Sequence, residues 1–323
     1  MTEVGKWNLE VLSLRRAGVE FYWIELAAPP QWESKPGQFF NIRCDDPAET
    51  SRVERVLEYG EEGPRPSLLG RENREITPLV RRPVSISDVR TDLDGRRRIV
   101  LLLRVVGPGS EYISKRRVGD RLDVIGPIGN SFDLDTPGDR AYLVGGGCGI
   151  APLVGLGRGL AGRGKKVTIF YGCRTGQLVA LTIPAEARAM GDGVQVLEGV
   201  AELGAAKLIV ATEDGSLGTG GLVTDAMVTH TAEVGWEGAS VFACGPDVMM
   251  SAVAALAKIN DVARCQVSLE NYMGCAIGVC LSCAVKLRTD DERGWTHRFV
   301  CQDGPVFEAG EVIFENKFEG CRR

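Results

Sequence analysis

The sequence predicts a multidomain protein in which a β-rich N-terminal domain precedes a parallel α/β domain and a small cysteine-rich domain. Short apolar runs separated by Gly, Pro and Asp fill the first part of the chain. Strand and helix patterns then alternate, which is typical of βαβ units. Five of the ten cysteines lie between Cys265 and Cys301. The length of 323 residues also favours several domains over one core.

The first domain is expected over residues 1–137. Its β-branched and aromatic runs, bounded by turn residues, favour a barrel or a sandwich. The predicted strands are Phe21–Leu26, Phe39–Ile42, Arg98–Leu103 and Arg121–Ile125. Residues 45–80 are polar and rich in Pro, Gly and charge, so we expect a surface insertion between two strands of this domain.

The second domain is expected over residues 138–262, as a parallel sheet flanked by helices. Its predicted strands are 141–144, 166–171, 207–211 and 240–244. A glycine-rich turn, Gly145–Gly149, follows the first strand, and the turn Cys244–Asp247 follows the last. Such turns let the backbone approach a pyrophosphate at one edge of an open sheet. A tight strand-to-helix connection without a ligand would also favour glycine, so the turns alone are weak evidence.

The third domain is expected over residues 263–323 and carries the strongest motif. Cys275, Cys280, Cys283 and Cys301 have the C-x4-C-x2-C…C spacing of plant-type [2Fe–2S] proteins. A structural zinc site usually pairs two C-x2-C hooks, and Cys301 has no such partner, although zinc or unligated core cysteines remain the alternatives. A metal centre would also stabilise a segment too small to form a core of its own.

Arg82 and Ser85 mark a second candidate site, in the β-rich half. We expect the two side chains to share one face of a strand, where they would hold a phosphate and the edge of a flavin ring. The alternative is an ordinary strand with a surface arginine.

Charge and composition exclude several function classes. The net charge is −5 and no run of Lys or Arg stands out, so we expect no nucleic-acid binding. The most apolar stretch, residues 141–160, is interrupted by glycines and a proline and predicts no membrane span. With no apolar signal segment near the first residue, a cytoplasmic protein without disulfides is expected. Only two histidines are present, which leaves little room for histidine-based catalysis.

A resemblance to a known family rests on eight motifs in a fixed order. They are RRPVSIS, LRVVGPGS, GPIGNSF, VGGGCGIAP, FYGCRT, CGPDVMM, SLENYMGCAIGVCLSC and FVCQDGPVF. The chain resembles the ferredoxin–NADP reductase superfamily and, more closely, the electron-transfer subunits of type B dihydroorotate dehydrogenases. The resemblance covers almost the whole chain apart from residues 45–80. It implies an antiparallel Greek-key β-barrel that binds FAD, an α/β domain that binds NAD(H), and a C-terminal [2Fe–2S] domain.

The resemblance also implies roles for individual residues. The expected FAD contacts are Arg82, Pro83, Val84, Ser85, Leu103, Arg104, Gly109 and Ser110. The expected NAD(H) contacts are Gly146, Gly147, Gly149, Cys244, Gly245 and Pro246. Val84 stands where many members of the superfamily have Tyr, so ring stacking on that side is absent.

The implied function is electron transfer with no protein general base. A partner dehydrogenase, implied to be a flavin-containing dihydroorotate dehydrogenase of pyrimidine biosynthesis, would pass electrons through the cluster and FAD to NAD⁺ within a hetero-oligomer. Three alternatives stay open: an input subunit of another complex, such as a sulfhydrogenase or an NADH-dependent ferredoxin:NADP⁺ oxidoreductase; a redox-sensing subunit; and a self-contained reductase. Four cysteine ligands favour the dihydroorotate type. Arg174 and Thr175 leave NADPH open, although the resemblance favours NADH.

Two further expectations concern the remaining cysteines and the cluster loop. Four cysteines are expected not to bind metal: Cys44, Cys173, Cys265 and Cys321. Cys148 and Cys244 lie in the nucleotide turns instead. The loop Asn271–Leu281 carries more apolar side chains than it can bury around a cluster, so we expect part of them to form an exposed docking patch.

Overall fold

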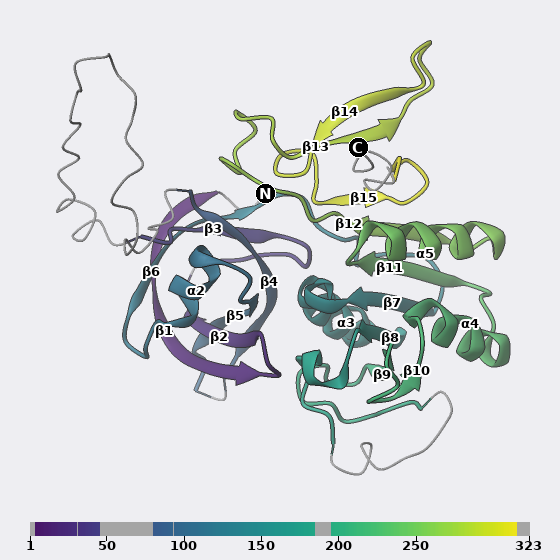
Figure 1. The fold of residues 1–323 in the computed structure, drawn as a ribbon, viewed down its shortest axis with the longest axis horizontal. Coiled ribbons are helices and arrows are strands. Elements are labelled where there is room, and N and C mark those ends of the chain that lie inside the picture. Colours follow the sequence, from purple (N-terminus) through teal and green to yellow (C-terminus); the bar gives the residue numbers. More distant parts are fainter. Residues whose placement is uncertain (1–3, 31, 46–79, 93, 185–194, 315–323) are drawn as a thin grey trace, which may run out of the picture.

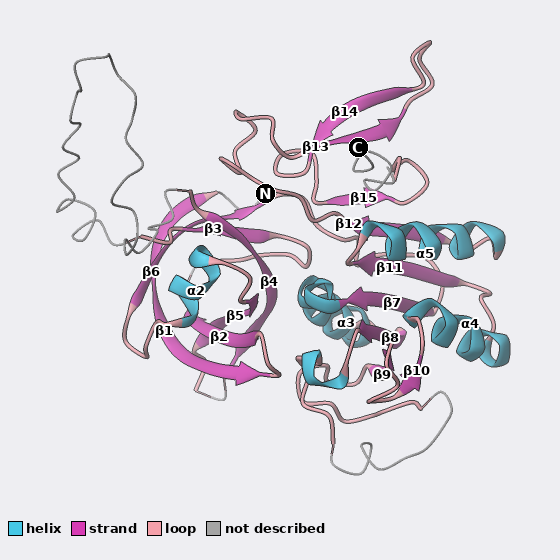
Figure 2. Cartoon of the chain, in the orientation of Figure 1, coloured by secondary structure: helices cyan, strands magenta, loops and turns pink. Residues whose placement is uncertain are grey.

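The computed structural model describes residues 4–30, 32–45, 80–92, 94–184 and 195–314. The expected insertion at 45–80 therefore lies almost entirely outside the described residues, as does Cys321. Figure 2 shows a half made almost wholly of strands beside a half in which helices flank a sheet. In the part of the chain that the structure describes, no helix has both the length and the apolar character needed to cross a bilayer.

The N-terminal half is a closed six-stranded barrel, so the barrel alternative is confirmed. Every strand pair in it is antiparallel, and the strand order is β1-β2-β5-β4-β3-β6. The strands are β1 Gly5–Ala17, β2 Phe21–Ala27, β3 Phe39–Ile42, β4 Arg82–Thr91, β5 Arg97–Arg104 and β6 Arg121–Ile128. Alternate side chains such as Ile24, Leu26 and Leu101 fill the interior, as the two-residue period of a strand requires. A short helix, α2 (Pro108–Ser114), adds Ile113 to this core.

The second half is built on a seven-stranded sheet of order β10-β9-β8-β7-β11-β12-β15. Its strands are β7 Arg140–Gly146, β8 Lys166–Cys173, β9 Lys207–Thr212, β10 Thr219–Gly220, β11 Ala239–Cys244, β12 Arg264–Ser268 and β15 Val306–Glu308. All neighbours are parallel except β12 and β15. From β7 the chain adds β8 and β9 on one side and returns to place β11 on the other. This reversal between β7 and β11 is the position at which open α/β sheets bind ligands.

Helices cover both faces of the sheet (Figure 1). They are α3 Ala151–Gly162, α4 Val223–Val234 and α5 Asp247–Ile259, with single 3-10 turns at η1 Gly147–Ile150 and η2 Gly176–Leu178. Leu143, Ile169 and Phe242 share one core with α3 and with the barrel residue Trp23. Val144 and Phe170, which point to the opposite face, share another core with α4 and α5. The helix α3 therefore lies between the sheet and the barrel.

The cysteine-rich segment is divided between the large sheet and a hairpin. The hairpin consists of β13 Ala284–Arg288 and β14 Trp295–Phe299, and projects from the body of the protein in Figure 1. β12 and β15, which also lie in the range 263–323, belong to the large sheet. Cys283 and Cys301 are packed in the same core as Val267 of β12. The segment is thus stabilised by the sheet on which it lies, and the domain limits drawn from sequence stay a prediction.

One asparagine joins the barrel to the turn that follows Cys301. The Asn130 amide donates to the carbonyls of Asp303 at 3.0 Å and Val306 at 2.8 Å, and its oxygen accepts from Val306 N at 2.9 Å. The backbone N–H of Asn130 also donates to Gly304 O at 2.7 Å. These bonds join the motif GPIGNSF at the end of the barrel to the motif CQDGPVF after the last cluster cysteine.

We predict that Asn130→Ala lowers the free energy of unfolding by about 1.5–4.5 kcal/mol, because three side-chain hydrogen bonds are lost at about 0.5–1.5 kcal/mol each. Urea unfolding measures the change. Asn260→Ala is the control, since its amide donates to one carbonyl, Leu256 O at 2.8 Å, far from this interface. Equal losses in the two variants would contradict the proposed clamp.

Candidate functional site

A cavity of about 740 Å³ opens at the carboxyl ends of the parallel strands, at the reversal between β7 and β11. Four of the expected nucleotide residues line it: Gly146, Gly147, Gly245 and Pro246. The barrel contributes Phe21 and Arg104 to the same cavity. The volume lies in the range of ordinary ligand and cofactor sites. One continuous space therefore touches both the expected FAD side and the expected NAD(H) side.

Gly149 and Cys244 support the cavity from behind. Cys244 is buried, and a Cβ placed on Gly149 would lie 2.1 Å from the Cys244 carbonyl oxygen. The two turns can therefore meet only because residue 149 is glycine. The expected direct contact of Gly149 and Cys244 with a nucleotide stays a prediction, and the structure gives both residues a packing role.

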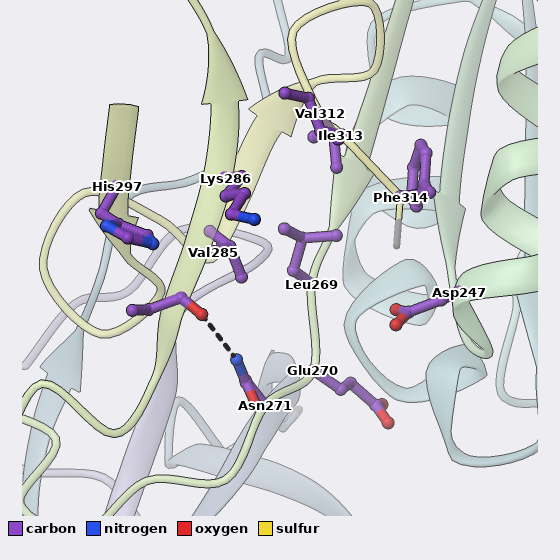
Figure 3. A pocket seen from close by; sticks show the side chains of 11 residues that line it. Asp247, Leu269, Glu270, Asn271, Val285, Lys286, His297, Val312, Ile313 and Phe314 are labelled. Carbon is purple, nitrogen blue, oxygen red and sulfur yellow. Dashed lines mark hydrogen bonds between the residues drawn. The ribbon is translucent and has the colours of Figure 1, made fainter. Parts of the chain in front are cut away.

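Glu270 is the residue that sequence reasoning missed. Its carboxylate lies 3.5 Å from Cys148 Sγ and 3.9 Å from Cys244 Sγ. The Glu270 side chain faces the large cavity, and protein atoms occupy most of the space around its carboxylate. This enclosure raises the pKa of Glu270, and burial raises the pKa of Cys148 to about 12. Glu270 also borders a second cavity of about 110 Å³ beneath β13 (Figure 3). Its place in the sequence, directly before the cluster loop, was the available signal.

The barrel residues of the expected FAD site lie on two faces of β4, so the prediction of one shared face is wrong. Val84 is packed in the barrel core, and Arg82 lies on the same side of the strand because side chains alternate. Ser85, three residues from Arg82, points to the outside. Arg82 passes over α2, because a Cβ on Gly109 would lie 2.7 Å from its Cγ. Glycine at 109 therefore makes room for the arginine.

The other expected FAD residues differ in what they can offer. The Leu103 side chain is buried in the barrel, so only its backbone faces outward. Arg104 is held by Glu20, with 2.8 Å between Nε and Oε2, and lines the cavity. The Ser110 hydroxyl accepts from Val106 N and Gly107 N and donates to Gly107 O, so it shapes the turn that begins α2. Among the expected FAD contacts, Arg104 is thus the residue that lines the shared cavity.

The expected cluster ligands form two pairs at one end of the C-terminal segment. Cys283 Sγ and Cys301 Sγ are 3.4 Å apart, and both residues are buried. On the loop, Cys280 N donates to Cys275 Sγ at 3.3 Å. Among the described residues, no three His, Cys, Asp or Glu side chains are grouped to hold a single metal ion. A two-iron cluster takes two protein ligands on each iron, which is consistent with an arrangement in pairs.

Backbone donors surround the loop sulfurs. Ile277 N donates to Cys275 Sγ at 3.4 Å, and Gly278 N donates to Cys301 Sγ at 3.2 Å. Ala276 and Leu281 have φ of 60° and 59°, a left-handed conformation that costs roughly 1–2 kcal/mol per residue. This strained wrap, with amides directed at sulfur, is a conformation suited to thiolates around a cluster.

The thiols differ in their surroundings. The hydrogen bond from Ser282 lowers the pKa of Cys280 to about 6, whereas burial raises the pKa of Cys301 to about 12. Metal coordination deprotonates a thiol whatever its free pKa. The four-thiol donor set therefore fits a [2Fe–2S] cluster. Three cysteines that are expected not to bind metal lie among the described residues. Cys44 is in the barrel core, Cys173 is at the end of β8, and Cys265 is on β12.

Two family profiles match the chain. The profile for the iron–sulfur cluster binding domain of dihydroorotate dehydrogenase B matches residues 270–313, which include all four expected ligands. The profile for the oxidoreductase NAD-binding domain matches residues 143–255, which include the glycine-rich turn and the Cys244 turn. The barrel, the parallel sheet and the cysteine loop thus define an oxidoreductase subunit with the fold of the ferredoxin reductases.

Whole-chain similarity narrows this class. The electron transfer subunit of dihydroorotate dehydrogenase B (NAD(+)) from Desulforamulus reducens is 32% identical over 311 residues, covering 96% of this chain and 98% of the relative. The same subunit from Bacillus mycoides is 37% identical over 240 residues, covering 74% of this chain and 82% of the relative. The chain belongs to the family of dihydroorotate dehydrogenase B electron transfer subunits.

Solved structures support the fold. The NADH-dependent reduced ferredoxin–NADP oxidoreductase, studied for flavin-based electron bifurcation, superposes with a TM-score of 0.67 and 26% identity, covering 96% of this chain and 91% of that chain. A ferredoxin reductase of carbazole 1,9a-dioxygenase superposes with a TM-score of 0.56 at 19% identity, covering 80% of this chain and 67% of that chain, which is a likeness of fold alone.

We predict that Cys283→Ser abolishes the cluster but leaves FAD bound, because the expected FAD contacts lie on the barrel. Iron and labile sulfide are measured on anaerobically purified protein, and flavin by its absorbance. The wild-type chain is expected to hold a single two-iron, two-sulfide cluster.

Cys265→Ser is the matched control, since Cys265 lies on β12 in the same segment. Loss of iron from this control, or stoichiometric zinc without iron in the wild type, would contradict the ligand assignment.

Proposed function

We propose that this chain moves electrons between NAD(H) and a catalytic dihydroorotate dehydrogenase subunit, through FAD and a [2Fe–2S] cluster. The observation that carries the proposal is the single cavity lined both by Arg104 of the barrel and by the glycine turns of the sheet. A second contact extends this arrangement, because the loop of Cys275 is hydrogen-bonded to the barrel strand β3. The three proposed cofactor sites would thus lie next to one another in one chain.

The barrel would bind FAD. Arg82 and Arg104 supply the positive charge that a pyrophosphate requires, and Gly109 leaves space for Arg82 to reach it. The flavin itself supplies the exchange between hydride transfer and single-electron transfer, and the protein holds it in place. Pro83 and Ser85, on the outer face of β4, would border the ring on the side of the cluster loop.

The sheet edge would bind NAD(H). Gly146 approaches Pro246 so closely that an added Cβ would lie 2.7 Å from the proline Cδ, so residue 146 presents only its backbone to the cavity. Backbone at that position allows a nicotinamide to lie flat against it, towards the barrel. Arg174 and Glu213, which follow β8 and β9, line the far part of the same cavity.

The face around the cluster loop would dock the catalytic subunit. Tyr272, Ile277, Val279 and Leu281 are 91%, 59%, 75% and 55% exposed, whereas Ala276 is buried. The expectation that only part of the loop packs inward is therefore confirmed. Exposed apolar patches of this kind mark protein interfaces.

We further propose domain limits of 1–137, 138–262 and 263–323. We also propose a cytoplasmic location, in keeping with the family's role in pyrimidine biosynthesis.

A second candidate is an NADH-dependent input subunit of another complex. The similarity to the NADH-dependent reduced ferredoxin–NADP oxidoreductase favours it, because that likeness spans nearly the whole chain. The two candidates share the cofactors and differ in the partner. Purification of the native complex distinguishes them by the subunit that accompanies this chain.

We predict that Arg82→Ala binds FAD about 10- to 150-fold more weakly, since a hydrogen bond to a charged group is worth about 1.5–3 kcal/mol. Fluorescence titration of FAD-free protein measures the dissociation constant. Arg121→Ala is the control, because Arg121 donates to Asn8 O on an exposed edge of the barrel. Unchanged FAD affinity in Arg82→Ala would remove Arg82 from the site.

We predict that the isolated chain reduces artificial acceptors with NADH but does not oxidise dihydroorotate, since no dihydroorotate site is expected in it. Addition of the catalytic subunit is expected to restore dihydroorotate-dependent NAD⁺ reduction. Tyr272→Asp or Ile277→Asp is expected to weaken this coupled activity while NADH-driven dye reduction is unchanged.

The control for docking is Ile259→Asp, which places the same charge on a 79% exposed apolar residue at the end of α5. Dihydroorotate oxidation by this chain alone would refute the proposed division of labour. A hydrogenase subunit in the native complex would instead favour the second candidate.

A further inference from the structure

Asn41 is a buried polar residue at the junction of the two expected cofactor sites. It lies on β3, is 2% exposed, and pairs in register with Pro83 of β4 and Ile125 of β6. Its chain neighbours Phe40 and Ile42 are packed inside the barrel, so Asn41 points outward. Residues paired directly across antiparallel strands share a face, and Asn41 therefore lies beside Pro83.

The amide nitrogen of Asn41 holds the cluster loop. Nδ2 donates to the carbonyl oxygen of Cys275 at 3.1 Å, across 234 residues of sequence. A carbonyl can only accept, so this bond fixes which end of the amide faces the loop. The sulfur of Cys275 in turn accepts from two loop amides, of Ile277 and Cys280. The position of the first expected ligand is therefore tied to a barrel strand.

The amide oxygen of Asn41 has no hydrogen-bond partner among the described residues, although it is buried. A buried acceptor without a donor costs about 1–3 kcal/mol, so such an atom requires an explanation. Pro83, its neighbour across the strand pair, has no N–H to offer. Thiolates and cluster sulfides accept hydrogen bonds, so a cluster would not satisfy this oxygen. FAD does carry N–H and O–H donors, and the neighbouring Pro83 belongs to the expected FAD site.

We propose that Asn41 is a positioning residue that bridges the two cofactor sites, with its nitrogen on the Cys275 carbonyl and its oxygen on a donor group of FAD. One side chain would then fix the separation between flavin and cluster on which single-electron transfer depends. This inference rests on the proposed function, since it needs both groups to be bound.

Two substitutions of similar size separate the two ends of the amide. Asn41→Leu removes both the donor and the acceptor. Asn41→Asp keeps an oxygen for FAD and places a carboxylate against the Cys275 carbonyl. Three properties of the purified holoprotein are compared: the affinity for FAD, the EPR spectrum of the reduced cluster, and the time courses of flavin and cluster reduction after rapid mixing with NADH.

We expect Asn41→Leu to bind FAD about 2- to 13-fold more weakly, which is the effect of one neutral hydrogen bond. In both variants the EPR spectrum is expected to shift and cluster reduction to lag behind flavin reduction. Asn41→Asp is expected to keep FAD within about twofold of wild type, because it retains an oxygen that can accept from FAD. Asn260→Ala, whose amide donates to Leu256 O remote from both sites, is the control for a general loss of stability.

Wild-type FAD affinity in Asn41→Leu, or an unaltered cluster spectrum and no lag in both variants, would overturn the inference. If Asn41→Leu does not fold, the lag in Asn41→Asp still decides the nitrogen contact. A wild-type chain that binds neither FAD nor iron would contradict the proposed function itself. If the wild type binds both FAD and the cluster but the Asn41 variants behave like it, only the role of Asn41 is contradicted.

Discussion

The structure depends on the packing of the barrel and the cysteine-rich segment against one parallel sheet. Helix α3 lies between barrel and sheet, and Asp88 of the barrel forms a salt bridge with Arg158 of this helix, with 3.0 Å between Oδ2 and Nε. Asn130 attaches the turn after Cys301 to the barrel. Because each part contacts the other two, their functional loops meet in one place. Electron transfer among three cofactors requires such a fixed arrangement.

Glycine at the edge of the sheet makes this approach possible. Gly149 lets the turn after β7 touch the carbonyl of Cys244 at the end of β11. The reversal of strand order between β7 and β11 leaves the edge open there. A larger residue at 149 would separate the two turns, and the cavity between barrel and sheet would lose one wall. Conformational freedom and close approach, rather than specific side chains, therefore shape the nucleotide side of the site.

The cluster side is shaped by sulfur and by backbone amides. The loop Asn271–Leu281 places N–H groups around Cys275 and Cys301. This arrangement requires a left-handed backbone conformation at Ala276 and Leu281. The side chains that would otherwise cover the loop are directed to solvent, which leaves an apolar surface beside the sulfur of Cys280. The same geometry that wraps the cluster thus creates the surface through which electrons would leave.

The sequence by itself determined the elements whose signal is local. Short β-branched and aromatic runs predicted β2, β3, β5 and β6, the glycine turns predicted the sheet edge, and the spacing of Cys275, Cys280 and Cys283 predicted the cluster loop. The expectation for Arg82 and Ser85 on β4 failed for a local reason, because residues three apart on a strand lie on opposite faces, and that alternation is already contained in the sequence. Only the tertiary structure decided the contacts of Glu270 with Cys148 and of Asn41 with Cys275. These contacts join residues more than a hundred positions apart, and only the packed barrel and sheet bring such residues together.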